Sequence, residues 1–465
     1  MSRLRYTHAS AFANDGNVYH WLDNPTPTLI PKIAETWGHT IARIYKNNNS
    51  NSNSDGFFAL VDNGHILTWS NKLVCEDLDP NPMLQTDTDL PPSTIPDCVA
   101  TSNGDMLVAV GNTVTRVMRD DRYCLCKFQV TLESPVNLIS YYLSSGFIRT
   151  CENRLYRFAY MRDAVMGGDE PIPNQDYELI ELNFSQADCI RKIVCELSYD
   201  LFLMVDGTVH ISKSFGTGND PIEANKHMPL HKIPFPSGES VIDIVHSVDI
   251  SDSEFGFIIY IMESGVCYYS KEPIHAAPNG LNKLPAHILL DHDKADDVAF
   301  ICPHPTPIHF LTDYFIEKAY ILDTAIMFQC SSNRLCIVNL ECTQSYRPWN
   351  NYIVGINPLY WSGEMRELGD RRTDDTESVV THSKGSDELE PVVIEFPTDT
   401  SIELVEQVGE YIYFTTDTGQ LYYGRYDTEP GHVQLERMQF FDANPIVIDK
   451  QNHTQPRSAG SLLKD

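Results

Sequence analysis

The densest group of metal-binding side chains in the sequence is Cys302-Pro-His304-Pro-Thr-Pro-Ile-His309. A thiolate and two imidazoles are ligands that Zn²⁺ prefers in proteins. However, three prolines stiffen this segment, and no second Cys/His cluster has a matching spacing. We therefore favour a proline-rich loop over a zinc site.

The acidic residues Asp374, Asp375, Glu377, Asp387, Glu388 and Glu390 could bind cations in a similar way. Their spacing does not fit a calcium-binding loop, in which ligands alternate along twelve residues. A solvated run of charge explains them better. We assign no metal-ligating residue.

Two pairs of cysteines could carry redox chemistry. Cys124 and Cys126 lie two residues apart, which places both thiols on one face of a strand because side chains alternate along a strand. Cys330 and Cys336 fall on opposite arms of one predicted hairpin, where their side chains could face each other. We interpret both pairs as small buried hydrophobic residues, which is the usual role of free cysteine.

Motifs of nucleophilic, metalloprotease or phosphate-loop chemistry are absent from the sequence. Ser214-Phe-Gly216-Thr-Gly218 resembles a phosphate cradle, but no lysine follows it and no βαβ pattern surrounds it. We predict a loop there. The sequence thus assigns no catalytic and no cofactor-binding residue, and we expect a protein that is not an enzyme.

The net charge of −30, from 64 acidic and 34 basic residues, limits the class of partner. Nucleic-acid binding gains affinity when Lys and Arg neutralise phosphates, so the acidic balance argues against nucleic acid as a partner of this chain. An acidic surface suits protein partners and keeps a protein dissolved through self-repulsion.

The N-terminus lacks the apolar core of a signal peptide, and no apolar run is long enough to span a membrane. Most of the twelve cysteines lie in apolar, strand-like segments, which predicts buried free thiols in a reducing compartment. The examples are Cys151, Cys195, Cys267 and Cys330. We therefore expect the cytoplasm or the nucleus.

The elements that would position any site are β-hairpins. Residues 200–212 read DLFLMVDGTVHIS, in which two alternating apolar arms flank Asp206-Gly207. Asp-Gly between such arms predicts a hairpin with a two-residue type I′ turn. Similar hairpins are predicted at 8–21, 56–69, 105–117, 146–158, 255–269, 325–338 and 411–424.

Most of these hairpins follow another short apolar strand, as at 136–139, 190–194, 241–245 and 402–405. The unit recurs at roughly 40 to 60 residues, a period that indicates propellers or solenoids. Stacking such sheets around an axis would bury both faces of each one and leave only short edges. The fold class predicted here is therefore an all-β propeller.

Three segments carry a resemblance to a known family: FFALVDNGHILTW at 57–69, LFLMVDGTVHI at 201–211 and IELVEQVGEYIYFTTDTGQLYYG at 402–424. They resemble the repeat of the regulator-of-chromosome-condensation family, whose members are seven-bladed β-propellers. The resemblance implies seven blades here, and it implies guanine-nucleotide exchange on a small GTPase as one possible activity.

Eight hairpins would give seven blades if residues 5–21 paired with the 411–424 hairpin in a shared closing blade; eight separate blades are the alternative. We predict one propeller domain over 1–449 with a flexible polar tail at 450–465. Loop insertions are predicted at 46–55, 161–177, 213–236 and 362–390.

The function expected from the sequence is a protein–protein interaction scaffold, as a subunit of a larger assembly. The alternatives are an exchange factor or regulator of a small GTPase and, less favoured, a propeller hydrolase or lyase.

Overall fold

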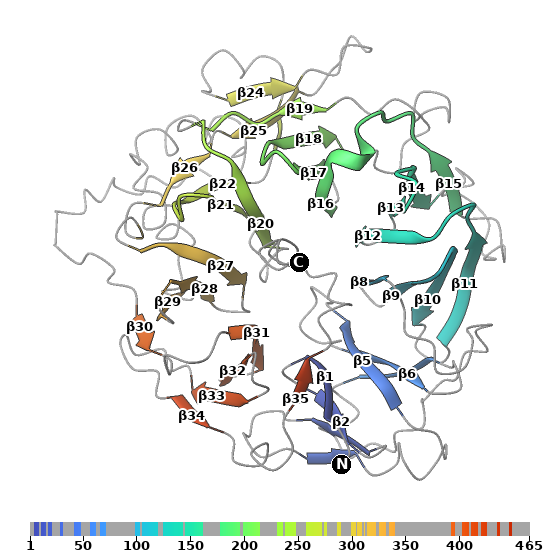
Figure 1. Ribbon diagram of the computed structural model, residues 1–465, viewed down its shortest axis with the longest axis vertical. Helices are drawn as coiled ribbons and strands as arrows, with labels where there is room; N and C mark the ends of the chain where they lie inside the picture. Colours follow the sequence, from blue (N-terminus) through green and yellow to red (C-terminus); the bar gives the residue numbers. More distant parts are fainter. Residues whose placement is uncertain are drawn as a thin grey trace, which may run out of the picture. The chain divides into compact units, whose positions relative to one another are not determined.

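The structure of the protein is a computed structural model, and Figure 1 shows its strands in chain order. The residues it describes are those of the strands and of one short helix, together with some connecting residues. The connecting residues are 111–112, 132–135, 151–154, 182–186, 205–208, 230, 233–235, 238–240, 263–266, 305, 308, 311, 314–315, 331 and 420. The chain divides into two compact units, which we call unit 1 (1–232 and 397–465) and unit 2 (233–396).

Unit 1 consists of six antiparallel sheets in its described residues, one of which gains an extra parallel strand. The first is β1 (Leu4–His8), β2 (Ala11–Asn14), β3 (Asn17–His20) and β4 (Thr28–Ile30), with β35 (Ile446–Ile448) beside β1. The second is β5 (Ile41–Asn47), β6 (Gly56–Val61) and β7 (Ile66–Ser70); the third is β8 (Cys98–Ser102), β9 (Asp105–Val110), β10 (Thr113–Arg119) and β11 (Cys124–Thr131). The fourth is β12 (Val136–Tyr142), β13 (Ser145–Thr150), β14 (Leu155–Tyr160) and β15 (Tyr177–Glu181). The fifth is β16 (Ile190–Cys195), β17 (Tyr199–Met204), β18 (Val209–Lys213) and β19 (His231–Lys232), entered through the 3₁₀ helix η1 (Ala187–Cys189). The sixth is β31 (Ile402–Val408), β32 (Tyr411–Thr416), β33 (Leu421–Arg425) and β34 (Leu435–Arg437).

Unit 2 holds three sheets in its described residues. One is β20 (Val241–Ser247), β21 (Phe257–Met262), β22 (Cys267–Lys271) and β26 (Thr306–Pro307). The next is a three-stranded sheet of β23 (Ile274–Ala276), β25 (Ala299–Pro303) and β24 (Ala286–Leu289). The last is β27 (Ile316–Ile321), β28 (Ala325–Cys330), β29 (Arg334–Asn339) and β30 (Val392–Glu395).

The all-β prediction is confirmed at the level of secondary structure, because η1 is the only helix in the described part of the chain. All eight predicted hairpins are antiparallel pairs, each in a sheet of its own, and seven are flanked by a further strand on both sides. The hairpin β6–β7 is flanked on one side, by β5, in the described residues. The strands that precede the hairpins are the first strands of these sheets. Alternating apolar residues therefore identified both the hairpins and their neighbours correctly.

The predicted type I′ turn at Asp206-Gly207 is wrong. The turn has three residues, Val205 to Gly207, and the φ of +79° at Gly207 is its only positive φ. The Gly207 N–H donates to the Met204 carbonyl at 3.0 Å, and the Met204 N–H donates to the Thr208 carbonyl at 2.8 Å. This arrangement fits a three-residue hairpin loop whose last residue is left-handed, so one positive φ suffices where type I′ needs two.

The same three-residue turn recurs in other sheets. Asn153, at φ +62°, and Gly265, at φ +80°, close turns with the same pair of backbone hydrogen bonds. The sequence places glycine or asparagine at the corresponding position in six hairpins, because these residues tolerate left-handed backbone best. They are Gly64, Asn153, Gly207, Gly265, Asn333 and Gly419.

A β-bulge follows the first residue of the first strand in six sheets. That residue is always isoleucine or valine, and it pairs with the last residue of the second strand, as Val136 does with Thr150. The six are Ile41, Val136, Ile190, Val241, Ile316 and Ile402. Bulges of this kind bend a strand and increase its twist. A bulge at one fixed place identifies the sheets as copies of one structural unit.

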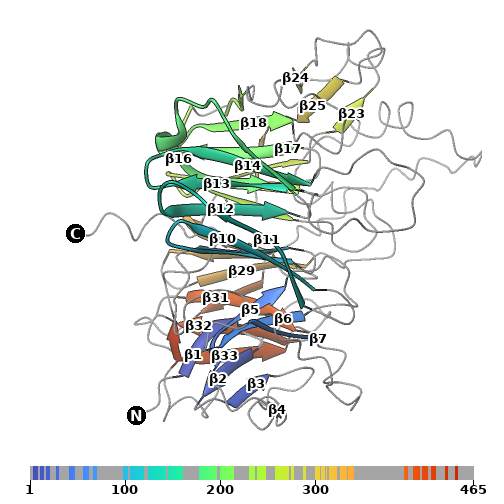
Figure 2. The ribbon, with the colours of Figure 1, turned by 90° about the vertical axis from the view of Figure 1, so that its right-hand side faces the viewer.

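Neighbouring sheets are joined by apolar cores in their described residues. In unit 1, the sheet β12–β15 packs on β8–β11 through one cluster that includes Leu107, Ile139 and Phe158, and on β16–β19 through another that includes Phe147 and Phe202. Figures 1 and 2 show β12–β15 between those two sheets. In unit 2, a third cluster joins β20–β22 to β27–β29. In these three interfaces, neighbouring sheets bury apolar side chains against each other.

The strand pairing predicted for the closing blade is wrong. Residues 5–21 do not pair with the 411–424 hairpin, which lies in the separate sheet β31–β34. Instead the later strand β35 pairs with β1 in parallel, Leu4 opposite Ile446. The ends of the chain do meet in one sheet, but through a strand that the hairpin pattern did not reveal. A count of seven blades is therefore not supported by the strand pairing.

Three of the predicted insertions also need correction. The 213–236 insertion begins at the last residue of β18 and contains the short strand β19, and Ile233 after it is buried, so this segment completes a sheet. The 46–55 insertion begins inside β5, which ends at Asn47, and the 161–177 insertion ends at the first residue of β15. The predicted loop at 362–390 and the tail at 450–465 lie outside the described residues. The single domain over 1–449 stays a prediction.

Candidate functional site

The best-defined surface in the structure is formed by hairpin turns and the segments that lead into the next sheet. We call it the turn edge of unit 1. It consists of the turns 111–112, 151–153 and 205–207 with the connecting segments 132–135 and 182–189. These residues lie at the same end of three successive sheets (Figure 2).

Backbone hydrogen bonds fix the turn edge. In two of its three sheets the first residue of a three-residue turn donates to the carbonyl just before the first strand: Cys151 to Pro135 at 2.7 Å and Val205 to Cys189 at 2.7 Å. In unit 2, Glu263 donates to Ser240 at 2.9 Å and Ser331 to Phe315 at 2.8 Å in the same way. The turns are therefore held by the fold, whatever side chains they carry.

Further bonds connect one sheet to the next. The Val136 N–H donates to the Gly111 carbonyl of the preceding hairpin at 2.8 Å, and Ile316 donates to Gly265 at 3.0 Å in unit 2. The Arg149 guanidinium of β13 donates to the carbonyls of Ala187, at 3.2 Å, and Ile190. Its Nε donates to the Asn137 side chain at 2.9 Å. Burial lowers the pKa of Arg149, and the carbonyls satisfy the charge.

The charged side chains of the turn edge are all acidic in its described residues. They are the exposed carboxylates Glu133, Glu152, Asp188 and Asp206, which together carry a charge of −4. The partly exposed Arg154 directly follows the turn 151–153. It lies 2.6 Å from Glu133 and 3.7 Å from Glu181, the last residue of β15, so it links the segment 132–135 to the end of that strand. A hydrogen bond to the Tyr156 hydroxyl, followed by these two carboxylates, raises the pKa of Arg154.

One apolar side chain stands out among these charges. Val205, at the tip of its turn, is 65% exposed although most valines are buried. The tips differ from sheet to sheet: Cys151-Glu152 in one turn, Val205-Asp206 in the next and Glu263-Ser264 in unit 2. A constant backbone thus presents side chains of different chemistry.

Beside the turn of the fifth sheet, three polar groups form a chain of contacts. The Asp206 carboxylate accepts from the Thr208 N–H at 2.9 Å and from its hydroxyl at 2.7 Å, and the hydroxyl lies 3.3 Å from His210 Nε2. Because the hydroxyl proton is directed to Asp206, His210 Nε2 must be the donor in the last contact. A nucleophile needs the opposite direction, with the imidazole accepting the hydroxyl proton. These contacts therefore stabilise the turn and do not activate Thr208.

The thiols at this edge differ from the sequence prediction. Cys151 is exposed, because it is the first residue of a turn and not part of a strand; Cys195, Cys267 and Cys330 are buried as predicted. Cys189 is exposed too, and a hydrogen bond to Asp188 raises its pKa. A protonated thiol is a poor nucleophile, so Cys189 is not suited to thiolate chemistry.

Two buried arginines occupy the same place in successive repeats. Arg116 of β10 is 3% exposed and lies 5.8 Å from the ring centres of Tyr141 and Phe158 in the next sheet. Arg157 of β14 is 2% exposed, lies over the Phe147 ring at 5.9 Å and interacts electrostatically with the buried Asp200 of β17. Burial lowers the pKa of Arg157, and the charge of Asp200 opposes that shift. Sequence patterning missed both arginines, because they sit at apolar positions of strands.

The candidate residues from the sequence are only partly brought together. Cys302 lies in β25 opposite His287, but His304 and His309 are outside the described residues. Cys124 and Cys126 share strand β11, as predicted. Residues 214–218 and the acidic run from 374 to 390 are outside the described residues. Cys330 and Cys336 do face each other, with their Sγ atoms 3.3 Å apart.

Two adjacent tyrosines of β22, Tyr268 and Tyr269, are both buried. Their rings lie on opposite faces of the strand because side chains alternate along a strand. Tyr269 packs in the core between sheets, whereas Tyr268 meets the Phe235 ring at 5.8 Å. Both faces of the sheet are covered, so neither ring is available for a partner.

Within the described ranges, no three His, Cys, Asp or Glu side chains lie close enough together to hold a metal ion. Among the described residues there is also no helix that is long and apolar enough to cross a membrane.

No protein-family model and no curated protein matches this chain. Solved structures that are similar include human WBSCR16, with 12% identity over 76% of this chain and 84% of that one and a TM-score of 0.41. The β-propeller domain of Myceliophteria thermophila Cps50 (Swd1) has 10% identity over 81% and 94% of the two chains and a TM-score of 0.39. Yeast RCC1 (Prp20), crystallised with Kap60, has 11% identity over 67% and 72% and a TM-score of 0.35. All three TM-scores are below 0.5, so these similarities support no functional argument.

Proposed function

We propose that this chain is a non-enzymatic β-propeller scaffold that binds proteins through the turn edge of unit 1 and belongs to a larger assembly. The observation that carries the proposal is the combination of a constant turn backbone with variable exposed tips. Binding residues are commonly carried on loops that a rigid framework positions. Here the framework is the repeated set of backbone bonds to Pro135 and Cys189.

The propeller in this proposal is supported by the strand order. In six of the eight hairpin-bearing sheets with described residues, the strands form an antiparallel meander of three or four strands. The first sheet adds the parallel strand β35 to a four-stranded meander, and the sheet of β20–β22 takes its fourth strand from β26. Repeated meanders packed face to face are the building blocks of propellers, and a C-terminal strand beside an N-terminal one is a common way to close such a ring. We propose that each hairpin-bearing sheet is one blade, which gives eight and not seven.

The repeated bulge and turn support repeats like those of the regulator-of-chromosome-condensation family. Buried thiols such as Cys195, Cys267 and Cys330 support a working place in the cytoplasm or nucleus, where thiols stay reduced. The acidic side chains around Val205 suit a partner with basic residues surrounding an apolar anchor, since opposite charges steer association.

Affinity capture of the full chain from its native cells, followed by mass spectrometry, tests the proposal. We expect a stable set of protein partners. The double variant Glu152→Lys with Val205→Asp should lose those partners, because it reverses a charge and removes the apolar tip without touching the backbone bonds. Gln129→Lys, on the exposed side of β11 and away from the turns, is the matched control and should retain them.

Two results would contradict the proposal: no reproducible partner at all, or partners that remain on the turn-edge variant. Capture of one small GTPase, with accelerated nucleotide exchange by the purified chain, would favour an exchange factor instead.

A further inference from the structure

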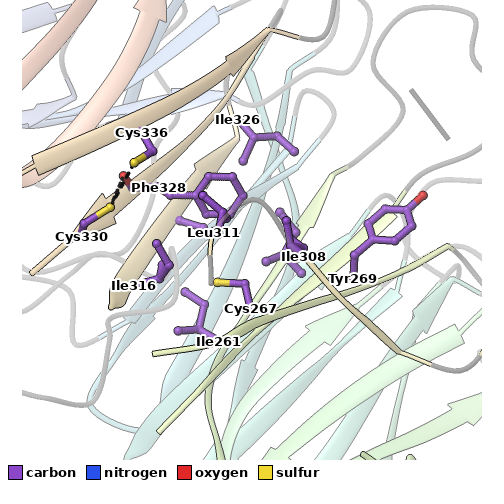
Figure 3. Close-up of a cluster of buried hydrophobic side chains, with 12 residues drawn as sticks. Ile261, Cys267, Tyr269, Ile308, Leu311, Ile316, Ile326, Phe328, Cys330 and Cys336 are labelled. Atoms are coloured by element: carbon purple, nitrogen blue, oxygen red, sulfur yellow. Dashed lines mark hydrogen bonds between the residues drawn. The ribbon is translucent and has the colours of Figure 1, made fainter. Parts of the chain in front are cut away.

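Two buried cysteines of unit 2 lie in contact in the core between its two four-stranded sheets (Figure 3). Cys330 is 2% exposed and Cys336 is fully buried, and their Sγ atoms are 3.3 Å apart. Both are free thiols. A thiol pair at this distance is a chemical feature that the proposed scaffold function does not use.

The hairpin register explains why the two thiols meet. Cys330 ends β28 and pairs with Arg334, while Cys336 of β29 pairs with Phe328. The cysteines are therefore diagonal neighbours on the same face of the hairpin, within reach of each other across two strands. A disulfide has an S–S distance of about 2.0 Å, so the sulfurs need to approach by only roughly 1.3 Å.

The two thiols differ in acidity. The hydrogen bond between the two thiols raises the pKa of Cys330 and lowers that of Cys336. The nearby Arg334 guanidinium also lowers the pKa of Cys336. Cys336 is thus the sulfur that ionises first, and the thiolate is the form that reacts with oxidants.

We propose that Cys330 and Cys336 form a reversible intramolecular disulfide when the protein meets a peroxide. The Cys336 thiolate attacks one peroxide oxygen, the O–O bond breaks, and Cys336 becomes a sulfenic acid as hydroxide leaves and takes up a proton. The Cys330 sulfur then attacks the sulfenic sulfur, loses its proton and displaces a second hydroxide, which is released as water. In total, two thiols lose two electrons and two protons, and one hydrogen peroxide becomes two waters.

Access to the pair is through the turn. Cys330 is the last residue of β28, and the next residue, Ser331, is partly exposed in the turn. Cys330 is paired with Arg334 on one side and with Ile316 on the other. Opening of its pair with Arg334 would admit a molecule as small as hydrogen peroxide, and hairpin ends open at lower free energy than core strands. A thiol or thioredoxin-like reductant would reverse the bond by thiol–disulfide exchange.

The same core contains a matched control thiol. Cys267 lies in this cluster and is buried to the same extent, but its sulfur forms no hydrogen bond to the pair in the described structure. Burial raises the pKa of Cys267, which makes it a poorer thiolate. It should remain a thiol under conditions that oxidise the pair.

The test is to treat the full chain with hydrogen peroxide, alkylate free thiols under denaturing conditions and map the peptides by mass spectrometry. We expect a peptide that contains 330–336 to become 2 Da lighter and to resist alkylation, with full recovery after dithiothreitol and no change at Cys267. With Cys330→Ala, a sulfenic-acid trap such as dimedone should label Cys336, whereas Cys267→Ala should leave the disulfide unchanged.

Alkylation of both Cys330 and Cys336 after peroxide treatment would overturn the proposal, as would a bond from either one to a different cysteine. The mapping on the unmodified chain decides the matter even if one of the variants fails to fold.

Discussion

At the scale of single residues, the third residue of each turn determines the local structure. Asn153, Gly207 and Gly265 have φ between +62° and +80°, and the turn hydrogen bonds form around them. Other residues pay about 1–2 kcal/mol for this conformation, and asparagine less. The pattern of glycine and asparagine was visible in the sequence, but the turn length was not, because a dipeptide such as Asp-Gly fits both two-residue and three-residue turns.

Gly265→Ala should destabilise the protein more than Gly111→Ala. Both glycines have positive φ, so both variants should lose about 1–2 kcal/mol for the backbone conformation. A Cβ at Gly265 would also meet the Phe315 ring at 2.6 Å and the Phe315 Cα at 2.9 Å, whereas a Cβ at Gly111 meets nothing within 4 Å. Overpacking adds about 1–3 kcal/mol. Urea denaturation measures both free energies of unfolding, and equal losses would show that the Phe315 contact costs nothing.

Thr208→Val should raise the pKa of the Asp206 carboxyl. The Thr208 side-chain hydrogen bond is the main cause of the lowered pKa of Asp206, and the backbone N–H of residue 208 contributes next. The variant removes the first bond and keeps the second, so the pKa should rise without reaching its ordinary value. Carbon-13 NMR titration of the carboxyl measures it, with Thr113→Val as the control that leaves the titration unchanged.

The sign of the pH effect follows from that shift. Because the folded pKa is depressed, this bond stabilises the fold above the ordinary carboxyl pKa, and the contribution is lost as pH falls through the folded pKa. Identical titration of Asp206 in Thr208→Val and the unmodified chain would contradict the assigned role of the hydroxyl.

At the scale of elements, the sheets are copies that differ at buried positions. Asp200 occupies a place in the second strand where the other copies have apolar residues or glycine. The corresponding residues are Phe57, Met106, Gly146, Ile258, Ile326 and Ile412. Arg157 lies in the preceding sheet, so the two opposite charges attract each other across a sheet–sheet interface.

Removing one charge of this pair should lower the free energy of unfolding strongly, and removing both charges should lower it less than the sum of the two single losses. Arg157→Met or Asp200→Leu leaves an uncompensated buried charge, which costs about 3–5 kcal/mol. The double variant replaces the pair with two apolar side chains and leaves neither charge buried without its partner. We therefore expect a coupling of about 1–3 kcal/mol in a double-mutant cycle measured by urea denaturation. Additive losses would show that the two residues do not stabilise each other.

Sequence patterning predicted the hairpins well and the buried polar residues poorly, for physical reasons. Alternation of apolar residues shows which strands are half-buried, and all eight hairpins follow it. The pattern did not predict that Arg116 and Arg157 are buried, because the groups that stabilise their charges are brought near only by folding. These groups are the Tyr141 ring for Arg116, and the Phe147 ring and the Asp200 carboxylate for Arg157. Strand β35 was missed because its three residues match no repeat and its partner β1 is more than 400 residues away. The turn edge was missed in part, since its acidic character arises from segments brought together only by folding.

At the scale of the whole chain, β35 joins the last part of the sequence to the first. Its three residues pair with Leu4, Arg5 and Tyr6, so β1 is flanked by β2 on one side and β35 on the other. Without β35, β1 would be an edge strand with unpaired backbone groups, which invites association with other chains.

A chain that ends before Ile446 should therefore be less stable and more prone to associate than the full chain. The loss of a few ladder hydrogen bonds, each of about 1 kcal/mol, should lower the melting temperature by several degrees. A chain that ends after Asp449 keeps β35 and is the matched control, which should have the same melting temperature as the full chain. Thermal melts and light scattering compare the three, and equal melting of both truncated chains would show that β35 does not close the sheet.

The most direct measurement for the central claim is hydrogen exchange of the chain alone and in its captured complex. If proteins bind at the turn edge of unit 1, peptides that cover 132–135, 151–154, 182–189 and 205–208 should exchange more slowly in the complex. Peptides of β11, which includes the control residue Gln129, should be unchanged. Slower exchange confined to other parts of the chain, with the turn edge exchanging as in the free protein, would contradict the claim.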